Sequence, residues 1–320
     1  MSSGPLSPPP PPPLPHTEDT DAYDTSGRYI VRLLPINDLP SLHATDEYKK
    51  GLITKIIYSN DATAGGDSSS SRILSAFKTN DHPSTLTITG VPLSCWRGVL
   101  KNVPGSLPPH EGSESPTTSK SFENSRALRL GSFHVILVSL ASSSFSPGPI
   151  LVLQGLRYKG NIGAIIRTAV QANLFQSVVV IDPVYDANAK NNDRVEAKDV
   201  DYYSLMNAPL IDIIYMTDLS EFQSYANSTE TNKNRKWLAT HLNNSAINMF
   251  SPLASPHLLA AAHTSFVFLG SEGVGLPDEF IEDSRCTCMR IPSMSSSINV
   301  GAAAAMLIAC ISMQKLKVRE

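Results

Sequence analysis

The sequence is poor in charged residues. Of its 320 residues only 17% are charged, and 26 Lys and Arg stand against 29 Asp and Glu, for a formal net charge of −3. The balance is even along the chain, because residues 1–149 hold 12 basic and 13 acidic residues and the rest hold 14 and 16. This composition excludes a protein that binds nucleic acid through bulk positive charge, although it leaves room for a local basic groove.

Cysteine is also scarce. The chain has four cysteines, Cys95, Cys286, Cys288 and Cys310, and they do not form two pairs with a two-residue gap. We therefore expect neither a zinc site nor a disulfide framework, and no resident metal. Cys286 and Cys288 alternate within the apolar run CTCMRI, which predicts that both thiols lie on one face of a buried strand.

No apolar run is long enough to cross a bilayer. The longest, Val300 to Ile311, falls short of the roughly 20 residues that a membrane-spanning helix needs, so we expect no membrane partner. Residues 1–26 contain six consecutive prolines and then four acidic residues, which predicts a disordered, solvated tail rather than a signal or transit peptide. A ligand for a proline-binding module is a second interpretation of this tail. We expect a cytoplasmic protein, with an organellar location left open.

The proline and serine that the chain does contain mark its organisation. Two segments rich in Ser, Gly and Pro, 65–71 and 102–125, interrupt residues 27–140 and predict flexible insertions in a small α/β domain. Residues 141–149 (ASSSFSPGP) predict a linker. Residues 150–320 then form a second domain.

This second domain alternates apolar strand-like runs with helix-like segments. The predicted strands are ILVLQGL, SVVVID, LIDIIYM, WLATHL, TSFVFLGSE and CTCMRI, and the predicted helices include NIGAIIRTAVQANLF, DLSEFQSYA and an alanine-rich helix over 297–317. Such alternation predicts an α/β fold with a mainly parallel sheet and helices on both of its faces.

Three segments in this domain each follow a strand and contain unusual residues, and the carboxyl ends of parallel strands are where such sheets bind ligands. In the first, Gly160 and Gly163 flank Asn161 at a helix start, and Arg167 is close enough to line the same opening. The second is the glycine-rich FVFLGSEGVGL, and the third, RIPSMSSSINVGAAAA, places hydroxyl groups before a helix. Each segment alone is equally consistent with an ordinary capped helix under a tight loop.

Taken together and in this order, NIGAIIRTA, LGSEGVGLP and IP…SINV resemble the three motifs of the SpoU/TrmH family of SPOUT RNA methyltransferases. The stretch ATHLNNSAINMF is also similar to the family's segment after the preceding strand, and the resemblance covers residues 150–317. It implies a trefoil-knotted sheet, S-adenosylmethionine as cofactor, and a homodimer packed through the knot and the last helix. On matching positions it implies four cofactor contacts: Thr240, Gly270, Ile291 and Ile298.

The reaction that the resemblance implies is methyl transfer to a ribose 2′-hydroxyl of structured RNA, either rRNA or tRNA. The residues that match the family's polar catalytic set are Asn161, Arg167, Glu272, Ser297 and Asn299. Because a guanidinium is effectively never deprotonated in proteins, we assign Arg167 the role of a bidentate clamp on an RNA phosphate rather than that of a base. Arg157 and Lys159 flank the first motif and are expected to touch phosphate as well, although solvated charge is the ordinary interpretation of both.

One spacing departs from the family. Six positions separate Ile291 from Ser297, where the family usually has eight, and Ile298 stands where it usually has leucine. A tighter loop around the cofactor raises an alternative, a non-catalytic RNA-binding or ribosome-assembly protein with a degenerate knot. The domain over 27–140 is similar in position to the small RNA-binding domain that many family members carry before the knot.

Overall fold

The structure is a computed structural model that describes residues 27–60, 86–103, 134–141, 147–181, 197–243, 245–271, 273–292 and 298–317. The predicted tail, the first insertion and most of the second lie outside these residues. So do Glu272 and Ser297, two members of the predicted catalytic set.

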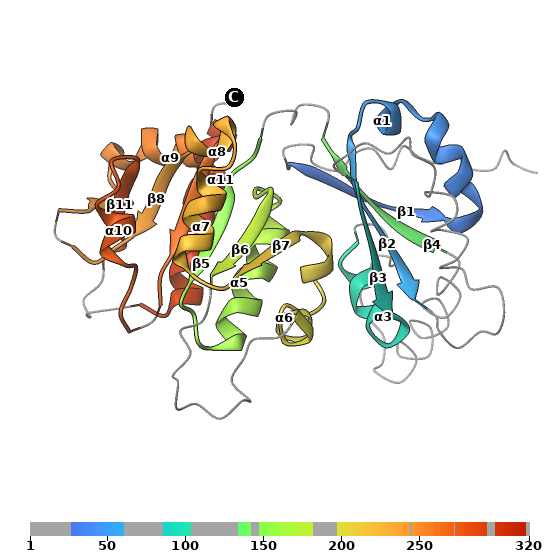
Figure 1. Cartoon of the computed structure of the whole chain (residues 1–320), viewed down its shortest axis with the longest axis horizontal. Coiled ribbons are helices and arrows are strands. Elements are labelled where there is room, and N and C mark those ends of the chain that lie inside the picture. Colours follow the sequence, from blue (N-terminus) through green and yellow to red (C-terminus); the bar gives the residue numbers. More distant parts are fainter. Residues whose placement is uncertain are drawn as a thin grey trace, which may run out of the picture.

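The first part of the chain forms a four-stranded mixed sheet in the order β1-β4-β2-β3 (Figure 1). Its strands are β1 (Tyr29–Pro35), β2 (Ile53–Asn60), β3 (Thr87–Pro92) and β4 (His134–Leu140). Between them lie a 3-10 helix (Ile36–Ala44) and the helices α1 (Asp46–Lys49) and α3 (Leu93–Lys101). The strand β1 lies at an edge of this sheet: among the described residues it pairs with β4, and it ends at a proline.

The second part forms a seven-stranded sheet in the order β7-β6-β5-β10-β8-β11-β9. Every strand pair in it is parallel, as the alternating pattern predicted. Its strands are β5 (Ile150–Gln154), β6 (Ser177–Ile181), β7 (Asp212–Met216), β8 (Lys236–Thr240), β9 (Ile247–Asn248), β10 (Ser265–Leu269) and β11 (Cys286–Arg290). The trefoil knot within this sheet stays a prediction.

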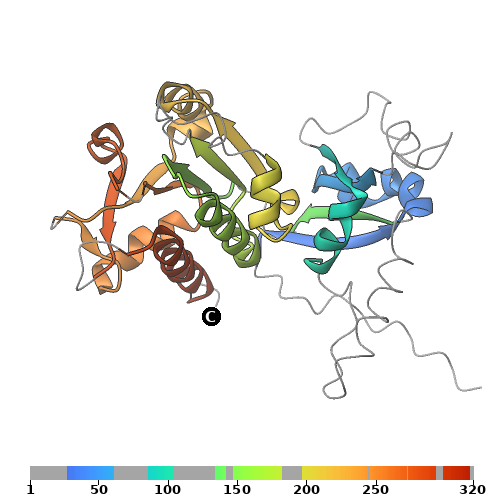
Figure 2. The ribbon, with the colours of Figure 1, turned by 90° about the horizontal axis from the view of Figure 1, so that it is seen from below.

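Helices cover both faces of the larger sheet, which confirms the predicted layers. The helices are α5 (Lys159–Ala172), α6 (Ala197–Tyr203), α7 (Leu219–Ala226), α8 (Glu230–Lys233), α9 (Ser255–Ala261), α10 (Asp278–Ile281) and α11 (Val300–Lys317). Side chains of α5, α9 and α11 share one core with alternate residues of the strands, and α7 and α10 share a second core with the other alternate residues. Figure 2 shows α5 and α11 side by side beneath the sheet.

The predicted helix over 297–317 begins at Val300 and is apolar on all sides. By length and composition, α11 is a helix that could cross a membrane, and it is the one such helix among the described residues. That is weak evidence, because a core helix of a soluble protein passes the same test. Leu307, Ile308 and Ile311 of α11 are buried against the sheet, and 28% of the helix as a whole is buried.

The two sheets contact one another where β1 and β2 of the smaller sheet meet the end of α5 and the edge strand β7 of the larger one. Asn173 ends α5 in the left-handed conformation, and its side-chain oxygen accepts a hydrogen bond from the backbone N–H of Tyr29 at 2.7 Å. The buried Nζ of Lys55 donates to the carbonyl of Ile211 at 3.1 Å and pairs with Asp212 at 3.2 Å. These contacts join the four-stranded sheet to the edge of the larger one, while the predicted domain boundaries stay a prediction.

The end of the predicted linker is fixed rather than free. Gly148 is buried, and its carbonyl accepts a hydrogen bond from Arg235 Nη1 at 2.7 Å. Arg235 itself is 2% exposed, and burial lowers the pKa of its guanidinium. Gly148 and Pro149 are therefore packed next to the start of β5, and the linker predicted over 141–149 stays a prediction.

Candidate functional site

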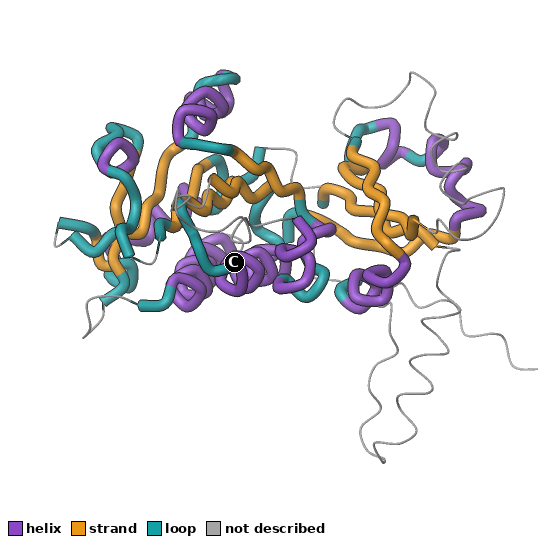
Figure 3. The backbone as a smooth tube through the Cα atoms, turned by 60° about the horizontal axis from the view of Figure 1, so that its bottom comes forward, coloured by secondary structure: helices purple, strands orange, loops and turns teal. Residues whose placement is uncertain are grey.

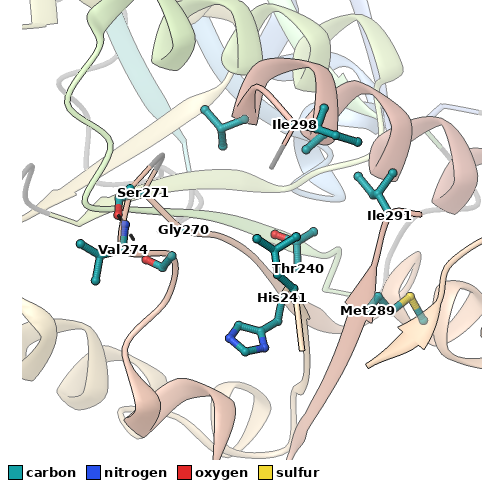
Figure 4. A pocket seen from close by; sticks show the side chains of 13 residues that line it. Thr240, His241, Gly270, Ser271, Val274, Met289, Ile291 and Ile298 are labelled. Atoms are coloured by element: carbon teal, nitrogen blue, oxygen red, sulfur yellow. Dashed lines mark hydrogen bonds between the residues drawn. The ribbon is translucent and has the colours of Figure 1, made fainter. Parts of the chain in front are cut away.

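A cavity of about 320 Å³ opens at the carboxyl ends of β8, β10 and β11 (Figure 4). It lies where parallel sheets bind ligands, and its volume falls at the lower end of the roughly 300–1,000 Å³ typical of small-molecule sites. The residues that line it are Thr240, His241, Leu242, Gly270, Ser271, Gly273, Val274, Gly275, Met289, Ile291, Ile298, Val300 and Ala303.

One wall of the cavity is the tight glycine-rich loop after β10. Backbone hydrogen bonds of 3.1 and 3.2 Å run in both directions between Ser271 and Gly275, and the N–H of Val274 donates to the Ser271 hydroxyl at 3.2 Å (Figure 4). A Cβ at Gly270 would lie 2.4 Å from the carbonyl carbon of Gly275, so this position admits only glycine. The loop therefore brings bare backbone to the edge of the cavity.

The opposite wall is apolar. Ile291, just after β11, and Ile298, just before α11, face the cavity, and Met289 and Val300 are also among the lining residues. The polar groups are few: the hydroxyl of Thr240 lies 3.5 Å from the carbonyl of Phe268, and His241 Nδ1 accepts a hydrogen bond from the N–H of Asn243 at 3.2 Å. When the imidazole is neutral, that bond leaves the proton on Nε2 as a donor. An apolar cavity with a few placed polar groups suits a small organic ligand.

All four residues predicted to contact a cofactor line this one cavity: Thr240, Gly270, Ile291 and Ile298. They come from four segments of the chain, and the sheet topology brings them together. Sequence reasoning missed several other lining residues, among them His241, Leu242, Ser271 and Met289. Their adjacency to the predicted positions was the one available signal, since each stands within two residues of Thr240, Gly270 or Ile291.

Two members of the predicted catalytic set meet beside the cavity. Asn299 Nδ2 lies 3.5 Å from Asn161 Oδ1, while Asn299 Oδ1 accepts from the N–H groups of Gly301 at 2.9 Å and Ala302 at 3.3 Å. Asn299 therefore caps α11 and points its amide nitrogen at the first turn of α5. The first and third motifs, 138 residues apart, are brought into contact.

Arg167 does not share an opening with Asn161, which differs from our expectation. Six residues along a helix amount to a rotation of about 240°, so the two side chains leave α5 on different faces. Asn161 points toward α11, whereas Arg167 is exposed and is not among the residues lining the cavity. Our expectation used the distance between the two residues along the helix axis and left out this rotation.

Arg157 and Lys159, the two cations that flank the first motif, have different surroundings. Arg157 is exposed, as a phosphate contact needs to be. Lys159 instead pairs with Asp199 of α6 at 2.8 Å, and both side chains are largely covered. Its charge is therefore used within the protein, where it fastens α6 to the first turn of α5.

The two cysteines of β11 are half-buried rather than buried, because β11 has only the two-residue β9 beyond it. Burial, with Cys288 as the next cause, raises the pKa of the Cys286 thiol to about 12, and burial also raises the pKa of Cys288. Both stay protonated thiols near neutral pH, which is unsuited to a nucleophile. Within the described part of the chain, no cluster of three or more His, Cys, Asp or Glu side chains could hold a metal ion.

Comparison with solved structures gives low similarity. The SpoU methyltransferase AviRb from Streptomyces viridochromogenes is 13% identical, with 90% of this chain and 91% of that one covered and a TM-score of 0.42. An AdoMet-bound rRNA methyltransferase from Sinorhizobium meliloti is 15% identical, with 89% and 87% covered and a TM-score of 0.40. A structure described as an RNA 2′-O ribose methyltransferase is 17% identical, with 91% and 90% covered and a TM-score of 0.41. These values are too low to carry an argument.

No curated protein matches the sequence. The family model described as the SpoU rRNA Methylase family does match, over residues 148–309. The match spans 162 of the 320 residues and includes β5, the cavity and the contact between Asn161 and Asn299. This chain belongs to the SpoU rRNA methylase family.

Proposed function

We propose that this protein transfers a methyl group from S-adenosylmethionine to a ribose 2′-hydroxyl of RNA. The observation that carries the proposal is the convergence of Thr240, Gly270, Ile291 and Ile298 on one cavity, next to the contact between Asn161 and Asn299. Family membership supplies the class of reaction.

The residues of the cavity fit the cofactor. Met289, Ile291 and Ile298 offer an apolar wall suited to a flat adenine ring, and the bare backbone at Gly270 allows close approach of a ligand. His241 and Ser271 offer hydrogen-bonding groups for its polar ends. When bound, S-adenosylmethionine supplies an activated methyl group on a sulfonium centre.

The protein's own contribution is to position the ribose, because a 2′-hydroxyl is a poor nucleophile. The amides of Asn161 and Asn299 are placed to hydrogen-bond groups next to the cavity. Arg167 is exposed and forms no ion pair with the residues that the structure describes, which supports a bidentate clamp on an RNA phosphate. Glu272 and Ser297 complete the proposed polar set.

We also propose that the protein is a homodimer packed through α11. Five exposed side chains of this helix form an apolar stripe with alternating spacings of four and three residues: Ala302, Met306, Ala309, Met313 and Leu316. Met313 is 56% exposed and Leu316 is 47% exposed. This spacing is that of a seam between two packed helices, and a second copy of the chain would cover it.

The cofactor is tested by titration calorimetry of the whole chain with S-adenosylmethionine. The proposal expects saturable binding, and Arg167→Ala should retain it while losing methyl transfer to RNA. Absence of binding would contradict the enzyme assignment and favour a non-catalytic RNA-binding protein. Retention of activity by Arg167→Ala would contradict the phosphate clamp alone.

A further inference from the structure

Three tyrosines are exposed around the first two turns of α5. Tyr158 is 66% exposed, Tyr202 is 68% exposed and Tyr203 is 42% exposed. Exposed aromatic rings that gather on one face of a protein suit contact with a partner. None of the three lines the cavity, so the proposed cofactor does not account for them.

Tyr158 stands at a position that its own helix does not explain. It is the N-cap of α5 but makes no side-chain capping hydrogen bond, although Ser, Thr, Asp or Asn would make one there. Its ring lies over Gly160, where a Cβ would meet ring carbon Cε1 at 2.7 Å. A poor N-cap and a glycine in the first turn both weaken α5. Together they leave room for the exposed Tyr158 ring to pack over Gly160.

Gly160 and Gly163 each leave a notch in the surface of α5, because glycine has no side chain. The notch at Gly163 holds the end of α6. A Cβ at Gly163 would lie 2.4 Å from the backbone and Cβ of Tyr203, so α6 touches α5 directly at this residue. The ion pair between Lys159 and Asp199 holds the other end of α6. The Tyr203 ring packs edge-on against Tyr202 at 5.1 Å. Figure 3 shows α6 next to α5 on the side away from α11.

Positive charge lies on the same face. Gly160, Gly163 and Arg167 follow one another at spacings of three and four residues, so the two notches and the arginine share one stripe of α5. Arg157 is exposed just before the helix. Fixed rings beside exposed guanidiniums match the chemistry of single-stranded RNA, whose unpaired bases stack on aromatic rings while its phosphates bind arginine.

We propose that Tyr158 and Tyr202 are a stacking platform for unpaired bases of the RNA substrate, with Arg157 and Arg167 as the adjoining phosphate contacts. The proposal rests on the proposed function and adds to it a surface outside the cofactor cavity. It predicts that the enzyme prefers a looped or single-stranded target, because paired bases present no free face to the rings.

The test is fluorescence anisotropy of the full chain with two labelled probes, a short oligoadenylate and a short blunt-ended RNA duplex. Tyr158→Leu and Tyr202→Leu should each weaken binding of the oligoadenylate by about tenfold, while Tyr158→Phe stays near wild type. Duplex binding should not change. Phe250→Leu is the matched control, because Phe250 is 58% exposed and lies beyond β9 at the other edge of the sheet.

Equal affinity of the leucine variants and wild type for the oligoadenylate would overturn the platform, as would an equal loss for both probes. A shift of Tyr158→Leu from dimer to monomer in sedimentation would also overturn it, since the rings would then cover a second copy. Methyl transfer to total RNA separates this proposal from the proposed function. A chain that binds the oligoadenylate through its tyrosine rings but transfers no methyl group would support the stacking platform and contradict the proposed function.

Discussion

Asn299 caps α11 with its side-chain oxygen and directs its side-chain nitrogen to Asn161 on α5, 3.5 Å away. One residue thus fixes the start of the last helix and joins the first motif to the third. Because both helices pack on the same face of the sheet, this contact fixes the polar groups next to the cavity wall.

Substitutions at Asn299 should separate these two roles. Asn299→Ser keeps a good N-cap but is too short to reach Asn161, so it should unfold like wild type and lose methyl transfer. Asn299→Ala loses the cap as well and should cost about 1 kcal/mol of stability. Denaturant unfolding together with a methyl-transfer assay distinguishes the two. Full activity of Asn299→Ser would show that the contact with Asn161 is dispensable.

The glycine-rich loop should tolerate a methyl group at one glycine and not at another. Gly270→Ala places a Cβ against the backbone of Gly275, and overpacking of this kind should cost about 1–3 kcal/mol and weaken S-adenosylmethionine binding. A Cβ at Gly273 meets nothing within 4 Å, so Gly273→Ala should leave the free energy of unfolding unchanged. Denaturant titration of both variants measures the difference, and equal stabilities would contradict the geometry of the loop.

Arg235 should be a structural anchor of the larger sheet. It donates to Gly148 O and to Asn232 Oδ1, and its guanidinium lies 5.3 Å from the centre of the Phe266 ring. Arg235→Met leaves these buried oxygens without their donor and should cost about 2 kcal/mol. Lys236→Met, at an exposed neighbour, should change stability by less than about 0.5 kcal/mol. Thermal unfolding of the two variants tests this, and similar melting temperatures would refute the anchor.

The apolar stripe on α11 predicts how dimerisation can be broken. Met313→Lys puts a charge into the stripe and should yield a monomer in sedimentation equilibrium, because an unpaired charge in a helix seam is costly. Gln314→Lys adds the same charge one residue along and off the stripe, and it should leave the dimer intact. A monomeric wild-type protein would refute the proposed interface outright.

The sequence predicted the parallel sheet well because its strands are buried on both faces and therefore read as continuous apolar runs such as SFVFL of β10. It missed α6, whose residues AKDVDYY carry no apolar periodicity, since that helix is held by Lys159 and by the notch at Gly163. Contacts of this kind join residues far apart in the sequence, and no local pattern records them.

The sequence likewise predicted one part of the candidate site and missed another. Thr240, Gly270, Ile291 and Ile298 were placed through their motifs, and the strand order then brings them to one cavity. The spacing of six residues puts Asn161 and Arg167 on different faces of α5, but which of them faces α11 depends on how the two helices pack, and the sequence does not record that packing. Tyr158 gave no signal, since an isolated tyrosine before a helix is ordinary until its exposure is known.

The most direct measurement is of the product of the reaction. Purified protein is incubated with S-adenosylmethionine carrying an isotopically labelled methyl group and with total RNA, and the RNA is digested to nucleosides and analysed by mass spectrometry. Our account predicts label in a 2′-O-methylated nucleoside, lost in Arg167→Ala. Label on a base, or no label in RNA from a preparation that binds the cofactor, would contradict it.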